Sequence, residues 1–311
     1  MNPAFSVVVF TTIAGAAQGL VVALALAALF GLRLAPGFAA LCLLIVGVML
    51  LVGLGASFLH LGRPGRAWRA AAMWRTSWLS REVIVLPAFI GVVALWWLAL
   101  RLGWPTPMTR LVLPMAAIGL AALLWYCTAM IYACLRFIEE WAQPLTVVNF
   151  VLLGLSSGGL LAAALGVLGG EAAFVAVTGP AALLATLVAW VCRTLALRHN
   201  AALRHRTTLQ SATGITSPRL VQKSMGMSAG SFNTREFFHR ASPQGLRQVK
   251  LALVVLGFAV PALLAAWALV SGVVWSYVLA VLVQVPGLVA DRWYFFAQAK
   301  HPQNLYYQTV G

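Results

Sequence analysis

Residues 38–61 read FAALCLLIVGVMLLVGLGASFLHL and contain no Asp, Glu, Lys or Arg. An α-helix rises about 1.5 Å per residue, so about 20 apolar residues cross a hydrocarbon core of roughly 30 Å. Backbone N–H and C=O groups find no water to bond within lipid, and a helix pairs them internally. Residues 38–61 are therefore predicted to form a transmembrane helix.

Seven further long, mostly apolar segments predict a bundle of eight membrane-spanning helices. The chain is 62% hydrophobic and 9% charged, whereas a soluble domain carries roughly 25% charged residues. The first segment has no Lys or Arg ahead of it and no A-x-A-like cleavage site, so we expect it to be retained. The prediction is an all-α polytopic membrane protein, with residues 1–311 as a single membrane domain. The other spans are expected at about 6–32, 82–100, 111–137, 145–168, 172–196, 251–270 and 274–296.

Basic residues are distributed unevenly between the two sides of the predicted bundle. The net charge of +15 comes from 21 basic and 6 acidic residues, and only Arg33, Arg101 and Arg110 lie on the side away from the termini. The positive-inside rule then places both termini in the cytoplasm, with the protein in the bacterial inner membrane. Basic loops beside spans also suit anionic membrane lipid, so nucleic acid is not expected as a partner.

The one long polar segment, residues 197–250, is predicted to be a cytoplasmic docking loop. It is rich in Ser, Thr and Gly but contains the aromatic and basic stretch FNTREFFHR at 232–240. A solvated linker is the alternative, but a linker has no need of clustered Phe side chains. We therefore favour an ordered surface that binds a soluble partner.

Cysteine and histidine positions give no sign of a metal centre in this chain. The four cysteines fall within the apolar spans without a C-x-x-C pair, so no zinc or iron–sulfur site is predicted. A haem held by two histidines needs facing imidazoles within the spans, and only His60 lies near one. Haem is therefore not expected. The cysteines are Cys42, Cys127, Cys134 and Cys192, and the other histidines are His199, His205, His239 and His301.

His60 and Glu82 form the candidate site. His60 lies at the end of the second span and Glu82 opens the third, so both are expected at one membrane face on neighbouring helices. Ionisable groups at membrane depth are costly and indicate function by default. Alternatively, Ser80 caps the helix and Glu82 complements its dipole. An imidazole can protonate a quinone oxygen, and a carboxyl group at the water edge can resupply that proton. Because the chain has no redox centre of its own, the electrons would come from a partner.

Other polar residues in the spans have simpler explanations. Gln18 and Gln284 are expected to hydrogen-bond across helices. Asp291 is expected to form a local ion pair with its neighbour Arg292. The two glutamates at 139–140 serve either in proton uptake or only at the end of a helix.

A set of short motifs runs nearly the length of the chain: NPAFSV at 2–7, HLGRP at 60–64, SRE at 80–82, YACLRF at 132–137, SFNTREFFH at 231–239, RWYFF at 292–296 and HPQ at 301–303. In combination these motifs resemble the membrane-anchor subunit of the dimethyl sulfoxide reductase family. Within that family the similarity is greatest to the anchors of membrane-bound sulfite dehydrogenases.

The resemblance implies a complex of three subunits. A molybdopterin catalytic subunit passes electrons to a four-cluster iron–sulfur subunit, which docks on the anchor. The anchor binds quinone (ubiquinone or menaquinone) and has no haem, so molybdopterin and iron–sulfur clusters belong to the partners only. The quinone-site His and Glu of the family correspond to His60 and Glu82. The chain would then react with quinone without itself acting on the substrate of the catalytic subunit.

The predicted function is electron transfer from the iron–sulfur subunit to quinone, in sulfite oxidation at the cytoplasmic face. The charge distribution favours this branch, because family members differ in the side that their soluble subunits occupy. Three alternatives stay open. The first is the anchor of a quinol-oxidising reductase of the dimethyl sulfoxide type, and the second is a passive membrane scaffold. The third is a proton or small-ion transporter, which would need several ionisable groups near the bilayer midplane.

Overall fold

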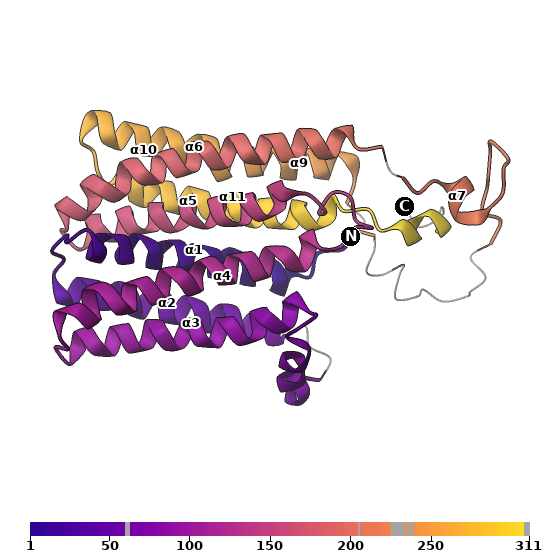
Figure 1. Ribbon diagram of the computed structural model, residues 1–311. Helices are drawn as coiled ribbons and strands as arrows, with labels where there is room; N and C mark the ends of the chain where they lie inside the picture. The colour runs from indigo at the N-terminus through magenta and orange to yellow at the C-terminus, as the bar shows by residue number, and fades with distance from the viewer. Residues whose placement is uncertain (60–62, 205, 225–233, 235–237, 240, 308–311) are drawn as a thin grey trace.

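The computed structural model describes residues 1–59, 63–204, 206–224, 234, 238–239 and 241–307. These residues contain helices and no strand, and eight of the helical segments are long and apolar enough to cross a membrane (Figure 1). The predicted all-α membrane fold with eight spans is confirmed. The spans are α1 (Phe5–Leu29), α2 (Pro36–Phe58), α3 (Trp78–Arg101), α4 (Leu113–Ala133) with the preceding turn η2 (Met108–Val112), α5 (Pro144–Leu168), α6 (Ala172–Ala202), α9 (Pro243–Val254) continuing through η3 (Val255–Ala259) into α10 (Val260–Ser271), and α11 (Ser276–Ala297).

Helix α3 begins earlier than its apolar sequence suggests. Its first residue is Trp78, because the Ser77 side chain accepts a hydrogen bond from the Ser80 N–H at 3.3 Å. A serine in this position satisfies one of the free N–H groups of the first turn. Hydropathy indicates where a helix meets lipid, whereas the cap determines where it starts, so the helix begins four residues before the span predicted at 82–100.

The helices that flank the long polar loop also continue beyond their apolar parts. α6 extends to Ala202, and α9 begins at Pro243 behind the cap Ser242, whose Oγ accepts from the Gly245 N–H at 3.1 Å. The connection between the two helices is therefore shorter than the predicted loop 197–250. It contains the short helix α7 (Leu209–Thr213). Most of the aromatic and basic stretch 232–240 lies outside the described residues.

Helices α1 and α5 form the centre of the bundle. α1 packs against α2, α4 and α5, and α5 also packs against α6 and α11. The two central backbones touch at Gly19 and Gly158: a Cβ on Gly158 would lie 2.3 Å from the Gly19 Cα. Small residues allow such close approach between membrane helices, where dispersion contacts replace the hydrophobic effect.

Large apolar side chains cover the outside of the bundle. Leu51, Leu184, Leu263 and Leu282 are each more than half exposed, although they lie in the middle of long helices. A protein surrounded by water rarely exposes so much continuous apolar surface. These side chains are therefore suited to contact with lipid.

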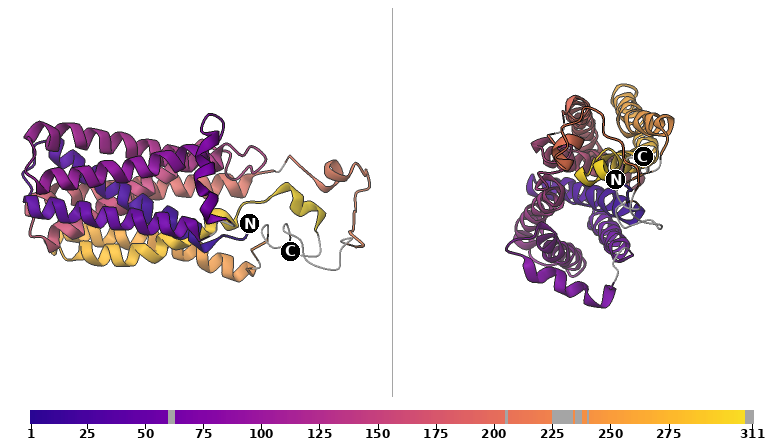
Figure 2. Two further views of the ribbon diagram at one scale, coloured as in Figure 1. Left: turned by 90° about the horizontal axis from the view of Figure 1, so that it is seen from below. Right: turned by 90° about the vertical axis from the view of Figure 1, so that its right-hand side faces the viewer.

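The N-terminus and the residues that follow α11, up to Tyr307, lie at one end of the bundle, termed here the loop face (Figures 1 and 2). It carries the connections from α2 to α3, from α4 to α5 and from α6 to α9, together with the residues after α11. The short helix η1 (Pro64–Met73) runs across the bundle axis at this end (Figure 1). By the order of the spans, all basic residues except Arg33, Arg101 and Arg110 lie in the connections at the loop face or in the adjoining parts of the helices.

Candidate functional site

Glu82 lies near the start of α3, close to the loop face, and its side chain is buried at 6% exposure. Thr128 on α4 donates a hydrogen bond from its hydroxyl group to the Glu82 carboxyl group. Ser77, not Ser80, caps α3, and no acidic residue falls in the first turn of the helix. The helix dipole acts mainly within that turn, so it does not account for Glu82. The carboxyl group is instead a buried group held by a neighbouring helix.

His60, the other half of the predicted pair, lies outside the described residues. The helix before it, α2, ends at Phe58 and packs against α3. The helices on either side of the predicted pair are thus neighbours, and the connection between them belongs to the loop face. Of the two predicted site residues, the structure describes the position of Glu82.

Thr128 and Tyr132, both on α4, were not predicted as site residues. Thr128 bonds the Glu82 carboxyl group directly, and Tyr132 follows Thr128 by one helical turn on the same face of α4. A lone threonine in an apolar helix carries little sequence signal, but Tyr132 begins the motif YACLRF. Its ring is fixed by contacts with the aromatic residues Trp141, Phe150, Phe295 and Phe296.

Arg81 points into the connection that leads into α3. Its Nε donates to the Trp74 carbonyl oxygen at 2.9 Å, and its Nη2 donates to the Arg75 carbonyl oxygen at 2.8 Å. The guanidinium group also lies 4.0 Å from the ring centroid of Trp78, in cation–π geometry. These contacts tie the polar segment before α3 to the first turn of the helix, one residue away from Glu82.

A buried ion pair joins α6 to α11. The Arg193 Nε donates to the Asp291 carboxylate at 2.5 Å, and both side chains are buried. The expected local pair between Asp291 and Arg292 was therefore wrong. Successive residues of a helix do not face each other, and Arg292 instead lies over the Phe150 ring at 4.0 Å. The prediction that Gln18 and Gln284 bond across helices is confirmed, since Gln18 donates to the Ala121 carbonyl and Gln284 to the Ser156 hydroxyl, both at 2.9 Å.

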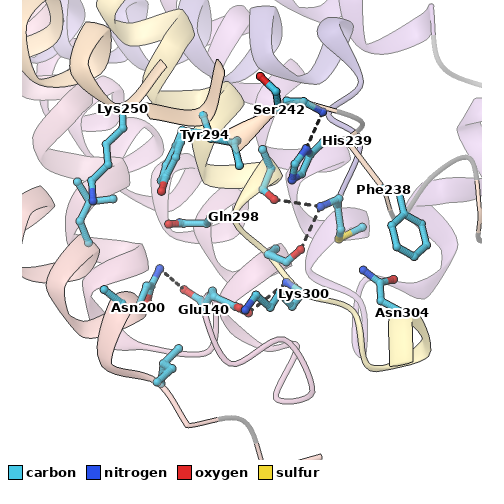
Figure 3. A pocket seen from close by; sticks show the side chains of 18 residues that line it. Glu140, Asn200, Phe238, His239, Ser242, Lys250, Tyr294, Gln298, Lys300 and Asn304 are labelled. Carbon is cyan, nitrogen blue, oxygen red and sulfur yellow. Dashed lines mark hydrogen bonds between the residues drawn. The ribbon is translucent and has the colours of Figure 1, made fainter. Parts of the chain in front are cut away.

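A pocket of about 680 Å³ opens at the loop face (Figure 3). Its wall combines the end of α6, the start of α9, the end of α11 and residues 238, 239, 241 and 242 of the polar loop. The Lys300 N–H donates to the Glu140 carboxylate at 3.3 Å, which closes one side. The polar residues of this loop-face pocket include Glu140, Asn200, His239, Lys250, Tyr294, Gln298 and Lys300.

Two histidines near this pocket are held toward their neutral form. Burial, followed by the positive charge of the Met1 amino group, lowers the pKa of His239 and also that of His301. The His239 Nδ1 accepts a hydrogen bond from the Ala241 N–H at 3.0 Å. Because its Nδ1 accepts a hydrogen bond and its charged form is disfavoured, the His239 imidazole lines the pocket as a neutral ring.

Within the described residues, no group of three or more His, Cys, Asp or Glu side chains comes together as a metal site would require. The four cysteines are free. Cys134 was expected within a span, but it follows the last residue of α4 and is exposed.

Eight apolar helices, a polar loop face and buried ionisable groups define a polytopic membrane subunit. Residues 1–296 match the family described as "DMSO reductase anchor subunit (DmsC)", and the chain belongs to this family. The family predicted from the motifs is confirmed. The chain is therefore a membrane anchor subunit for an oxidoreductase complex of the dimethyl sulfoxide reductase type.

Two relatives illustrate the similarity. The chain is 46% identical to the C subunit of the sulfite dehydrogenase from Allochromatium vinosum, and the alignment covers 100% of both chains. It is 33% identical to "Anaerobic dimethyl sulfoxide reductase chain YnfH" from Escherichia coli, over 37% of this chain and 41% of the relative. The similarity to a sulfite dehydrogenase protein agrees with the prediction from the motifs.

Proposed function

We propose that the chain binds quinone at Glu82 and His60 and reduces it with electrons from an iron–sulfur partner, in a complex that oxidises sulfite. The observation that carries the proposal is the buried Glu82 carboxyl group, held by Thr128 close to the loop face. Membership of the anchor family supports a place in an oxidoreductase complex. The name of the Allochromatium vinosum relative supports sulfite as the substrate of the catalytic partner.

Glu82 and His60 would have complementary roles. Bound quinone supplies an acceptor for two electrons and two protons. The Glu82 carboxyl group can donate a proton to a ligand oxygen, while the Thr128 hydroxyl group orients the carboxyl. The His60 imidazole, a group that ordinarily titrates near neutral pH, would hydrogen-bond and protonate a quinone oxygen. The apolar outer surface of α2 and α3 lets a hydrophobic acceptor approach from the lipid.

The soluble partners would dock on the loop face. This face has the loop-face pocket and the basic segments before α3 and after α6, which suit a partner with an acidic surface. The proposed order is a four-cluster iron–sulfur subunit against the anchor, with the molybdopterin catalytic subunit bound to it. All metal cofactors would then lie in the partners, with quinone as the only redox group bound by this chain.

The loop face is proposed to be cytoplasmic, with both termini inside, because nearly all basic residues lie on that side. Alkaline phosphatase is active only outside the cytoplasm, so fusions report sidedness. A fusion after Tyr307 is expected to be inactive, and a fusion after Gly103, in the connection following α3, is expected to be active. The reverse pattern would place the soluble partners on the periplasmic side and favour the quinol-oxidising alternative.

The complex is expected to reduce a short-chain ubiquinone only when this chain is present. Chemically reduced complex would be mixed with the quinone, and cluster oxidation would be followed by absorbance. The soluble subunits purified without the anchor are the control, and they should react at least about tenfold more slowly because they lack the proton-donating groups. Equal rates with and without the anchor would support the passive scaffold instead.

A further inference from the structure

A second group of buried polar side chains lies between α5, α6 and α11, deeper in the bundle than the loop-face pocket. Asn149, Arg193, Asp291 and Arg292 line a cavity of about 10 Å³, and each of these side chains is buried. Four polar groups around one small space inside lipid-spanning helices are costly to keep there. None of these four side chains takes part in the reaction proposed at Glu82.

Asn149 indicates that this cavity is suited to water. Neither its amide nitrogen nor its carbonyl oxygen has a hydrogen-bond partner in the part of the chain that the structure describes, although both atoms are buried. An unsatisfied buried polar group costs about 1–3 kcal/mol. The cavity has about the volume that a single water molecule requires, and its walls supply several polar partners. A water there would bond Asn149 and lie beside the Arg193–Asp291 pair.

The small cavity and the loop-face pocket share a wall. Glu140, Asn200 and Gln298 line both spaces, and Figure 3 shows their side chains around the larger one. Gln143 lines the small cavity and bonds this wall, with its Nε2 donating to the Asn200 Oδ1 at 2.7 Å and to the Glu140 carbonyl oxygen at 3.0 Å. One layer of polar side chains therefore separates the open pocket from Asn149.

Tyr132 connects the small cavity with Glu82. It follows Thr128, whose hydroxyl group bonds the Glu82 carboxyl group, by one turn of α4, so the two side chains lie on the same face of the helix. Its ring lies 5.9 Å from the Phe150 ring and 5.4 Å from the Phe295 ring, centroid to centroid, and both phenylalanines line the cavity. Tyr132 thus lies next to the residue that bonds Glu82 and against two side chains of the cavity wall.

We propose that protons for quinone reduction enter through the loop-face pocket and reach Glu82 through the Asn149 cavity and the Tyr132 hydroxyl group. This inference rests on the proposed quinone site. For each quinone, two electrons come from the iron–sulfur partner and two protons from water at the loop face. The Glu82 carboxyl group loses its proton as an O–H bond forms on the quinone. Tyr132 then passes its proton to Glu82 and takes one from the cavity water, which is resupplied from the pocket, so both residues end unchanged.

The Tyr132→Phe variant tests the inner step, because it removes only the hydroxyl group and keeps the ring that packs among aromatic residues. In the reduced complex mixed with short-chain ubiquinone, cluster oxidation is expected to slow about tenfold or more and to depend more strongly on D₂O. The quinone concentration for half-maximal rate should not change. Tyr277→Phe is the matched control, since it removes a buried hydroxyl group near Gly179, away from this path, and should react as the wild type does.

The Asn149→Leu variant tests the outer step by lining the cavity with a hydrocarbon side chain. It is expected to slow the reaction by a similar factor, and Asn149→Ser, which leaves room and polarity for water, should restore most of the rate. Gln284→Leu is the control: it replaces a buried amide that bonds Ser156 outside the cavity. Wild-type rates and isotope effects in both Tyr132→Phe and Asn149→Leu would overturn the route while leaving the quinone site intact. A wild-type complex that does not reduce quinone would overturn the site and the route together.

Discussion

The Glu82→Gln variant of the assembled complex is expected to reduce quinone about a hundredfold more slowly than the wild type. The amide has nearly the same shape as the carboxyl group and can still accept the hydrogen bond from Thr128. It cannot give up and regain a proton, and general acid catalysis contributes about 10²–10⁴ in rate. The measurement is stopped-flow oxidation of the pre-reduced iron–sulfur clusters by short-chain ubiquinone.

Glu171→Gln is the matched control for this experiment. Glu171 lies at the opposite end of the bundle, before α6, where its carboxylate accepts a hydrogen bond from the Ala35 N–H at 2.9 Å. The same chemical change at that site should leave the rate of quinone reduction unchanged. Equal rates in wild type and Glu82→Gln would remove Glu82 from the reaction.

The Asp291→Asn variant is expected to be the most destabilising polar substitution in the chain. Asp291 is the carboxylate partner of the buried Arg193 guanidinium group, and the buried Arg292 side chain lines the same small cavity. Removing the Asp291 charge leaves the buried Arg193 guanidinium group without its ionic partner, at a cost of about 3–5 kcal/mol. Thermal unfolding of the detergent-solubilised complex, followed by tryptophan fluorescence, measures the loss.

Arg193→Met supplies the comparison. It removes one of the two buried guanidinium groups, so Arg292 and Asp291 leave one cation and one anion in place of two cations and one anion. We expect this variant to unfold at a temperature between those of the wild type and Asp291→Asn. A greater loss in Arg193→Met than in Asp291→Asn would show that the charge balance assigned to this cluster is wrong.

The sequence predicted the eight spans because burial in lipid leaves an unbroken apolar signal, as in residues 38–61. It did not predict the helix ends, since Ser77 and Ser242 act through single hydrogen bonds that hydropathy does not detect. The extension of α6 to Ala202 was missed for the same reason: a helix that leaves the lipid can continue with polar residues.

The candidate site was predicted only in part. Glu82 was identifiable because a carboxyl group at the start of an apolar span is costly, whereas its partner Thr128 lies 46 positions away on another helix. The pairing of Asp291 with Arg193 was missed because helix–helix geometry, and not adjacency in sequence, decides which groups meet. The sequence did not single out Asn149, because an amide without a hydrogen-bond partner is recognised only when its surroundings are known.

The buried charges argue against the transporter alternative. Glu82, Glu140, Arg193, Asp291 and Arg292 are the buried charged residues of the part of the chain that the structure describes. All five belong to the halves of their helices, or to the connection, nearest the loop face. Toward the opposite end, the buried polar residues of the spans are neutral, among them Gln18, Ser156 and Gln284. Within the described residues, no chain of buried ionisable groups therefore runs from the loop face to the opposite end of the bundle.

The most direct test of the account is to locate the quinone in the assembled complex. A density map of the complex in lipid nanodiscs with short-chain ubiquinone would show the bound ring. The account predicts a quinone oxygen within hydrogen-bonding distance, about 3 Å, of the Glu82 carboxyl group, with the His60 imidazole at the same ring. A ring bound at the opposite end of the bundle, or far from Glu82 on the loop-face side, would contradict it.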